Sequence, residues 1–584
     1  MYSSPMSTAN TEEATPRGGA STTQDVGETS QTASPPLSPE PEECRRRQVR
    51  LELLKRHLAA CLCSEETLTI TLVRENNPQK TLRLKQCSVQ GEQLAAMLGK
   101  CLSLTNFMSI NNGLTLSDAE TLFKAPRKLT GVLRMGIEER WVKNESLVGL
   151  LKLAAEVQGN ITEVTIRRDT SLFVVEQEFP HPVEKVESVV SRLHQCELEA
   201  KGVPFLQTFV EKCHQLCVLN WSEVQFTDTE AATISSALLH FPVLKRLELT
   251  CCRISPFGIE HLAEALSQCT AIEDINISKC NLGLEGLSNL VNALEGKLHL
   301  KSINLGFLNL ENGNALKLIS RLSTLPLLRR LVLNNNSLRS EVCPHLAETL
   351  KNAIHMEEIN LSYNEIEDAG VKEIATAVPQ MKNLKQIDLS HNSISSVGGQ
   401  CFVEALAGSE RLEELRLSEN NLGCETAAKL AAILPSVHHL KVLHLSSCNI
   451  DSEGISHLTK ALSECPQIQE LSLSENCIGN KGVKALAEGL TWSSQLRKIE
   501  LKMCRITDSA SRPLASGLSR CALLEEIVLS WNALGDESAL ELAMILPGME
   551  RLRILDLDHN EITACGIRGL AEELIQCRRI QSVR

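Results

Sequence analysis

Cysteine is the residue type in this chain with the most varied chemistry, because a thiolate can bind a metal or act as a nucleophile. The 584 residues include 22 cysteines. Five of them recur at multiples of one constant interval: Cys213, Cys269, Cys465, Cys521 and Cys577. The ligands of one metal must converge on a single point, and this regular spacing does not gather them. The pattern favours small buried thiols over a metal or catalytic site.

Other sequence motifs of catalysis are missing. We find no G-x-S-x-G, H-E-x-x-H or paired C-x-x-C motif. Gly99 and Lys100 are followed by Cys101, where a phosphate-binding loop would have Ser or Thr, and the segment has a helical pattern. His438 and His439 are adjacent in a predicted connection, which favours a solvated loop over a metal site. We therefore expect no enzyme activity, no cofactor and no metal.

The elements that carry these residues follow a repeated phrase, L-x-x-L-x-L-x-x-N/C-x-L. Its copies begin at Leu216, Leu244, Ile272, Leu300, Leu328, Met356, Leu384, Leu412, Leu440, Ile468, Leu496, Leu524 and Leu552. The starts are equally spaced, so each lies as many residues after the previous start as Leu244 lies after Leu216. A weak copy begins at Ser188, and Ile580 stands at the next step. A constant period without insertion indicates a repeat array.

One phrase predicts a short strand followed by a helix. Leu412, Leu415 and Leu417 alternate toward a core, and Asn420 follows where the chain leaves the strand. The second half of each repeat has apolar residues at helical spacing, as in residues 258–269. Strands and helices at this period predict an α/β fold, a leucine-rich-repeat solenoid of the ribonuclease-inhibitor type. In this horseshoe, parallel strands line the concave face and helices cover the convex face.

The composition divides the chain into four segments. Residues 1–44 are rich in Ser, Thr, Pro and Glu, which predicts a disordered tail. Residues 45–64 predict an amphipathic helix, whose basic start favours a solvated helix end over a localisation signal. Residues 65–215 carry degenerate repeats, and a separate small domain is the alternative there. Residues 216–584 carry the regular repeats, of which the last is truncated.

Charge and hydropathy limit the partners and the compartment. The net charge is -13, and residues 1–44 hold seven acids and one base. Phosphate backbones prefer basic surfaces, so direct nucleic-acid binding is disfavoured, whereas a basic protein partner is allowed. The sequence shows neither a secretory signal nor an apolar run long enough to span a bilayer. We expect a reducing compartment, free thiols and no membrane contact.

The concave strand face is the candidate protein-binding surface. Counting the phrase start as position zero, we expect positions two, four, six and seven to point outward. The candidate partner-binding residues are Tyr363, Glu414, Arg416, Glu419, Glu470, Glu475, Met503, Val528, Trp531 and Asp556. They predict an acidic face with a basic island, against the alternative of an ordinary solvated surface. Trp531, Met503 and Val528 are expected to be neighbours in an interaction hot spot, against the alternative of a locally packed patch.

The uniform repeats and the phrase LSWNALGDE (529–537) resemble the C-terminal repeat region of the NLR family, specifically its CARD-containing kind that activates MHC class I genes. The resemblance implies CARD-like and NACHT domains outside this chain, with ATP binding in the latter. It also implies residence in cytoplasm and nucleus. The implied function is regulation of innate immune signalling and MHC class I transcription through protein partners. Because the last repeat breaks off after Ile580, we expect the chain to be a fragment.

A free-standing inhibitor that binds a basic partner is the alternative class. A ribonuclease-inhibitor-like protein would use an acidic concave face against a basic enzyme. Its repeats alternate in length and are richer in Cys, so the constant repeat length of this chain argues against it. A cytoskeletal cap would need a helical region specific for its partner, for which the sequence gives no sign.

Overall fold

The computed structural model divides into two units, Met1–Ala60 and Cys61–Arg584. It describes seven strands between residues 69 and 222, then residues 231–232, 235–236, 238–239 and 244–584, apart from 253, 491–493, 576 and 578. The predicted tail (1–44), the predicted amphipathic helix (45–64) and Cys213 lie outside the described residues. The segment boundaries assigned from the sequence stay predictions.

The first strands of the second unit form one sheet with irregular spacing. They are β1 (Thr69–Thr71), β2 (Thr81–Lys85), β3 (Asn106–Ile110), β4 (Arg134–Glu139), β5 (Glu163–Arg168), β6 (Val189–His194) and β7 (Leu216–Ser222). Paired residues are 25 apart between β2 and β3 and 29 apart between β4 and β5. Strand β1 pairs antiparallel with β2, so the expectation of an entirely parallel sheet is wrong at this end. A connection too short for a crossover helix accounts for the antiparallel pair.

The strands that follow are short and regular. They are β8 (Arg246–Glu248), β9 (Asp274–Asn276), β10 (Ser302–Asn304), β11 (Arg330–Val332), β12 (Glu358–Asn360), β13 (Gln386–Asp388), β14 (Glu414–Arg416), β15 (Val442–His444), β16 (Glu470–Ser472), β17 (Lys498–Glu500), β18 (Glu526–Val528), β19 (Ile554–Asp556) and β20 (Ser582–Val583). Each pairs in parallel with the next, and paired residues are 28 apart throughout, as between Glu414 and Val442. This confirms the predicted leucine-rich-repeat solenoid.

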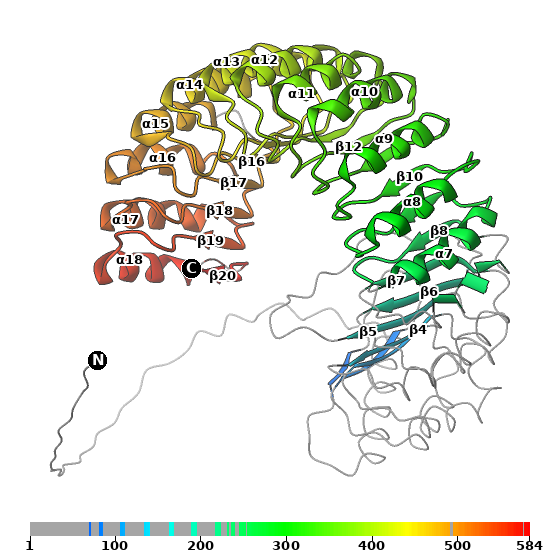
Figure 1. Ribbon diagram of the computed structural model, residues 1–584. Helices are drawn as coiled ribbons and strands as arrows, with labels where there is room; N and C mark the ends of the chain where they lie inside the picture. The colour runs from blue at the N-terminus through cyan, green and yellow to red at the C-terminus, as the bar shows by residue number, and fades with distance from the viewer. Residues whose placement is uncertain are drawn as a thin grey trace, which may run out of the picture. The chain divides into compact units, whose positions relative to one another are not determined.

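A helix follows each regular strand from β8 to β19. The α-helices are α7 (Pro256–Gln268), α8 (Gly283–Ala293), α9 (Glu311–Leu322), α10 (Cys343–Asn352), α11 (Glu367–Ala375), α12 (Ser396–Ala405), α13 (Gly423–Ile433), α14 (Ser452–Leu462), α15 (Gly479–Leu490), α16 (Ser511–Leu518), α17 (Asp536–Ile545) and α18 (Ala564–Leu574). Short 3-10 helices are η2 (Ser340–Val342), η3 (Val378–Gln380), η4 (Leu406–Gly408), η5 (Leu434–Ser436), η6 (Asp508–Ala510) and η7 (Leu546–Gly548). Within this array the strands line the inner, concave side and the helices the outer side (Figure 1).

Leucine and isoleucine fill the space between strands and helices. Leu412, Leu415 and Leu417 are at most 1% exposed, as the phrase predicts. In the neighbouring repeats the equivalent positions are also buried, so the core is a stack of similar layers. Each repeat can bury its apolar side only against the next one, which makes the array quasi-one-dimensional.

The asparagine at position eight connects adjacent repeats. Asn420 Nδ2 donates to the carbonyl oxygens of Leu389 and Leu417, at 2.9 Å each. Its Oδ1 accepts from the backbone N–H groups of Asn392 and Ile394, at 3.0 Å each. One buried amide therefore satisfies backbone groups of two repeats, which would otherwise be costly to bury.

Cysteine replaces this asparagine in some repeats. Cys448 Sγ lies 3.3 Å from the Leu417 oxygen, and Cys504 Sγ lies 3.4 Å from the Leu473 oxygen. The thiol thus keeps the donor role of the amide but offers no comparable acceptor. Burial raises the pKa of both thiols to about 12.

The cysteine column at the helix ends is also buried. Cys465 Sγ lies 3.4 Å from the Leu434 oxygen, and Cys269, Cys465 and Cys521 are buried while Cys577 is half-buried. All four of these thiols are free, and the expected burial is confirmed for Cys269, Cys465 and Cys521. Lys297 stands in the same column, 1% exposed, and its Nζ donates to the Ser267 oxygen at 2.7 Å, near the C-terminal end of α7.

Leu308 stands at position eight of its repeat, in place of the usual asparagine or cysteine. The side chain packs in the core with 7% exposure, and its N–H donates to Asn336 Oδ1 at 2.9 Å. This turn nevertheless differs from the others, because both Asn309 and Glu311 have positive φ, 52° and 42°. Each of the other described turns has at most one such residue at the corresponding positions.

From the repeat that begins at Leu328 to the one that begins at Leu496, turn geometry alternates although the repeat length does not. Position nine has positive φ in the repeats that begin at Leu328, Leu384, Leu440 and Leu496. Position eleven has positive φ in the repeats that begin at Met356, Leu412 and Ile468. An extra parallel bridge links each repeat of the first kind to the next repeat, such as Ser395 to Asn421. We call such a linked pair of repeats a repeat doublet.

Candidate protein-binding face

The concave face is built from the outward positions of the short strands. In β14, Glu414 and Arg416 are half-buried while Leu415 between them is fully buried. Positions two and four therefore present their side chains on the concave side, followed by positions six and seven beyond the strand. The period-two alternation of a strand accounts for this arrangement.

Charge is unevenly distributed along this face. In the repeats of β12–β19, the outward carboxylates are Glu358, Asp388, Glu414, Glu419, Glu470, Glu475, Glu500, Glu526, Asp556 and Asp558, and the outward cations are Arg416, Lys498 and Lys502. In the repeats of β8–β11, the outward cations are Arg246, Lys279 and Arg330, and the carboxylates are Glu248 and Asp274. We call the first set, with ten carboxylates against three cations, the acidic half of the concave face.

The predicted basic island is paired with its acidic neighbours. Arg416 forms an ion pair with Glu414. Lys498 Nζ lies 2.9 Å from Glu500 and 3.4 Å from Glu526. These cations therefore organise the nearby carboxylates rather than form a separate basic surface.

Two further contacts involve Glu470 and Glu475. Glu475 lies 3.6 Å from Lys502 Nζ and accepts from Ser447 Oγ at 2.9 Å. Glu470 lies 3.7 Å from His444 Nε2, and a hydrogen bond from His444 holds the pKa of Glu470 below its ordinary value. Both carboxylates retain partial exposure on the concave side.

Position seven forms a row of left-handed residues, which we call the αL row. Tyr363, His391, Glu419, Met503 and Trp531 all have φ between 53° and 58°. A non-glycine residue with such a φ is uncommon. The conformation recurs at position seven in every described repeat from Cys251 to His559, so it is a property of the turn and not a mark of one functional site.

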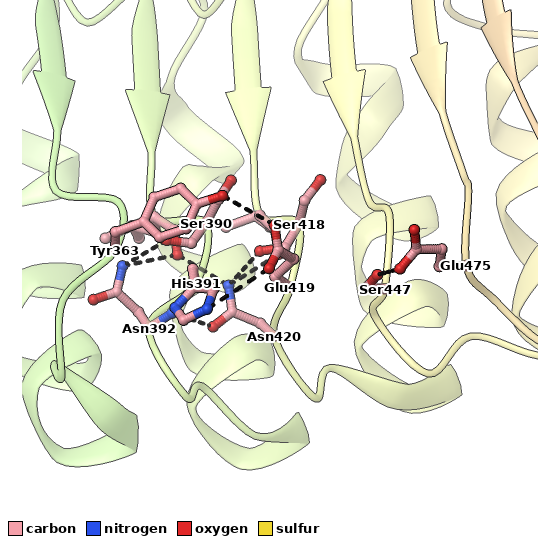
Figure 2. Close-up of polar contacts among 11 residues, drawn as sticks. Tyr363, Ser390, His391, Asn392, Ser418, Glu419, Asn420, Ser447 and Glu475 are labelled. Atoms are coloured by element: carbon pink, nitrogen blue, oxygen red, sulfur yellow. Dashed lines mark hydrogen bonds and ion pairs between the residues drawn. The ribbon is translucent and has the colours of Figure 1, made fainter. Parts of the chain in front are cut away.

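The first aromatic cluster of the row contains three side chains from successive repeats. Tyr363 and His391 stack with ring centroids 4.6 Å apart and planes 17° from parallel. Tyr363 Oη donates to Glu419 Oε1 at 3.1 Å, and His391 Nε2 lies 3.7 Å from Glu419 Oε2 (Figure 2). The hydrogen bond to Glu419 raises the pKa of Tyr363. Figure 2 shows the three side chains converging beyond the ends of the strands.

The second aromatic cluster surrounds Trp531. Its ring lies 3.9 Å from that of His559, with planes 7° from parallel, and His559 Nδ1 lies 2.7 Å from Asp558 Oδ2. Trp531 keeps 49% of its surface exposed and Met503 keeps 46%. The Met503 N–H donates to the Ser530 oxygen at 3.0 Å, which places Met503 in the strand-end turn beside that of Trp531.

The predicted site residues are spread over the whole acidic half. Tyr363 meets Glu419, Glu414 meets Arg416, and Val528 lies between Glu500 and Asp556 in the sheet register. Tyr363 and Asp556 belong to repeats separated by six others, so the ten residues do not form one compact pocket. Whether they bind a partner stays a prediction.

His391 and His559 were missing from the predicted site, although each stacks on an aromatic residue of that site. Their common position, seven residues after the phrase start, was the available signal. Charged residues at position one were also missed. Lys385 Nζ lies 2.6 Å and Arg329 3.1 Å from Glu357, and Lys385 chiefly holds the pKa of Glu357 below its ordinary value.

No group of three or more His, Cys, Asp or Glu within the described part of the chain could hold a metal ion. None of the described helices combines the length and the hydropathy needed to cross a membrane.

Known proteins with leucine-rich repeats are similar to parts of this chain. The family described as Leucine Rich repeat matches residues 352–375, 380–403, 438–458, 464–487 and 520–543. Protein NLRC5 of Homo sapiens is 38% identical over 225 residues. The chain has a leucine-rich-repeat fold and is similar over part of its length to NLRC5. That match covers 38% of this chain and 12% of the human protein.

Two further proteins are similar to the chain. Protein NLRC5 of Mus musculus is 31% identical over 223 residues, which cover 37% of this chain and 12% of the mouse protein. The chain therefore matches about an eighth of the length of these NLRC5 relatives. A solved LRR protein of Leptospira interrogans aligns with 91% of this chain and 98% of its own, at 14% identity and a TM-score of 0.34.

The repeat fold and the NLRC5 relatives point to a non-enzymatic repeat scaffold. A leucine-rich-repeat sheet offers a broad, preformed concave surface for protein binding. In the described part of this chain, that surface combines exposed aromatic residues with an excess of carboxylates.

Proposed function

We propose that this chain is the repeat arm of an NLR-type regulator of innate immune signalling and MHC class I transcription. It acts in cytoplasm and nucleus by binding proteins through the concave face. The observation that carries the proposal is the 38% identity to human NLRC5 over 225 residues. The acidic excess on the concave face agrees with protein partners rather than direct contact with DNA.

A reporter experiment tests this function. The full chain is expressed in cells that contain NLRC5 and an MHC class I promoter reporter. We expect the chain to change reporter output at least about twofold, because it shares partners with the repeats of NLRC5. A variant with Tyr363→Ser and Trp531→Ser on the concave face should lose the effect. Unchanged reporter output, with the chain present at levels comparable to NLRC5, would overturn the proposal.

A free-standing inhibitor of a basic enzyme is the second candidate function. The acidic half of the concave face favours it, because ten outward carboxylates against three cations complement a basic protein. The discriminating assay is inhibition of a pancreatic-type ribonuclease by the full chain. Tight inhibition that is lost on changing the concave carboxylates would favour this second function over the first.

A further inference from the structure

We infer that the acidic half of the concave face binds an arginine- or lysine-rich protein segment, with Trp531 as its anchor. The inference rests on the proposed function in assuming that the concave face is a protein-binding surface. It goes further by giving the chemistry of the partner, the strands that receive it and the residue on which it centres.

The position of the charge defines the receiving strands. Outward carboxylates exceed outward cations from β12 to β19, whereas β8 to β11 carry three cations and two carboxylates. Neighbouring strands are about 5 Å apart, which is shorter than the screening length of about 8 Å at physiological salt. The fields of adjacent carboxylates therefore add, and a cationic segment is drawn to this half of the face.

Several carboxylates in this half lack a permanently charged partner. Among the described residues, Asp388 and Asp556 form no ion pair, and each accepts one backbone N–H, from Ser390 and Asp558 respectively. The ion pairs of Glu419, Glu470 and Asp558 are with histidines, although Lys498 and Arg416 also act on Glu470 from farther away. These five carboxylates remain open to a cation from a partner.

The Trp531 cluster provides a fixed apolar contact within the acidic field. His559 covers one face of the indole, and the left-handed backbone at φ 58° sets its direction. About half of the surface of Trp531 stays exposed. A guanidinium or ammonium group gains energy over such a ring, and Trp paired with Arg is typical of interface hot spots. Val528 and Met503 beside it can contact the aliphatic stem of the same side chain.

Other occupants fit less well. A phosphate backbone would be repelled by the carboxylates. A largely apolar segment would find few exposed apolar side chains on this half, chiefly Tyr363, Met503 and Trp531. A basic segment satisfies both the charge and the aromatic contact, so it is the occupant we propose.

The test uses the full chain and a fluorescein-labelled octa-arginine peptide, with octa-glutamate as the matched anionic probe. Binding is followed by fluorescence anisotropy at about 50 mM and about 150 mM salt, because screening weakens contacts between charges. We expect octa-arginine to bind and octa-glutamate not to bind. Equal binding of the two peptides, or binding of neither, would overturn the inference.

The charge variant is Asp388→Asn with Asp556→Asn. Asn already occupies this position at Asn276, Asn304 and Asn360, where Oδ1 accepts the N–H two residues ahead, as the aspartates do. The variant should therefore keep the fold and weaken octa-arginine binding about threefold or more. The control removes two carboxylates from helix α7, Glu260→Gln with Glu264→Gln, and should bind like the unmodified chain.

The anchor variant is Trp531→Ser. Ser447 occupies the same position with φ 53°, so the turn accommodates serine. Loss of the ring should weaken octa-arginine binding about fivefold. The control is Phe307→Ser, which removes an aromatic residue from the same row but outside the acidic half. Unchanged binding by Trp531→Ser, or an equal loss in Phe307→Ser, would contradict the inference.

The two proposals fail in different ways. If octa-arginine binds as expected while the MHC class I reporter does not respond, the inference that the acidic half binds a basic segment is supported and the proposed immune function is contradicted. If the reporter responds but octa-arginine binding is absent, the immune function stands and its partner has another chemistry.

Discussion

Asn420 and Asn392 occupy the same position in adjacent repeats but have unequal roles. Asn420 Oδ1 accepts the Asn392 N–H at 3.0 Å, whereas the buried Oδ1 of Asn392 has no hydrogen-bond partner. Within each doublet the second repeat thus supplies this acceptor to the first. The oxygen of the first repeat is unused at Asn392, whereas Asn336 Oδ1 accepts the Leu308 N–H of the preceding repeat. Cys448 and Cys504, which offer only a weak acceptor, both stand in first repeats.

The first prediction compares the same substitution at these two positions. Asn420→Cys removes the acceptor of two buried N–H groups, those of Asn392 and Ile394, and should cost about 2–4 kcal/mol of stability. Asn392→Cys should cost less than about 1 kcal/mol, because its Oδ1 is unused and Cys448 shows that the site accepts a thiol. Denaturant unfolding of both variants measures the difference. Equal destabilisation would refute the unequal roles.

The second prediction concerns whole repeats. Deletion of residues 384–439 removes one doublet and joins a second repeat to a first repeat, as at every existing doublet boundary. Deletion of residues 412–439 instead removes Asn420, whose Oδ1 accepts the N–H groups of Asn392 and Ile394. Cys448 then takes the place of Asn420 and offers these N–H groups no comparable acceptor. Although it removes fewer residues, the second deletion should leave the less stable protein, by about 2–6 kcal/mol.

Thermal unfolding followed by circular dichroism compares the two deletions at equal concentration. A higher midpoint for the single-repeat deletion would show that the doublet is not a unit of stability. The comparison is internally controlled, because both deletions remove whole repeats and keep the parallel register of the remaining strands.

The third prediction concerns thiol reactivity. Burial raises the pKa of Cys448 and Cys504 to about 12, so at pH 8 very little thiolate is present and the sulfur is inaccessible. Cys477 and Cys565 are exposed. Brief treatment of the native chain with iodoacetamide should label Cys477 and Cys565 but not Cys448 or Cys504, as read by peptide mass spectrometry. Labelling in denaturant serves as the control, and rapid native labelling of Cys448 would contradict the packing.

The fourth prediction is a pH dependence from the position-one charges. Ion pairs with Lys385 and Arg329 lower the pKa of Glu357. Because the folded pKa lies below the unfolded one, the stabilisation is complete above about pH 4.3 and is lost as the pH falls through the folded pKa. Glu357→Gln should therefore lower stability by up to about 1 kcal/mol at neutral pH.

The pH profile of the melting temperature tests this sign. The curves of the unmodified chain and Glu357→Gln should converge as the pH falls below about 4. Added salt should also reduce the difference in melting temperature between the two proteins, because these side chains are partly exposed and salt screens their charges. A gap that widens toward acid pH would show that the ion pairs are not its source.

The regular part of the fold was predictable from the sequence because its signal is apolar spacing. Leu412, Leu415 and Leu417 must be buried together, and that requirement alone defines the strand and its register. The alternation of the turns was not predictable in this way. Glu367 and Gly423 have the same left-handed geometry at position eleven, so residue type does not reveal the conformation.

The candidate site was predictable in composition but not in its contacts. Carboxylates and aromatic residues at outward positions could be assigned from the period alone. That Tyr363 hydrogen-bonds Glu419, two repeats further along the chain, depends on side-chain directions at the αL row. That Trp531 is covered by His559 depends on the same geometry.

The constant register also has a mechanical consequence. Force applied to the two ends would load each strand pair in the same way, so the array would lengthen in discrete steps. Release of one repeat frees about 100 Å of chain. Because each doublet has an extra bridge and hydrogen bonds from a buried asparagine, we expect the links inside a doublet to be stronger than those between doublets. The steps would then favour lengths of about 200 Å, and the chain would behave as an extensible spring whose unit is two repeats.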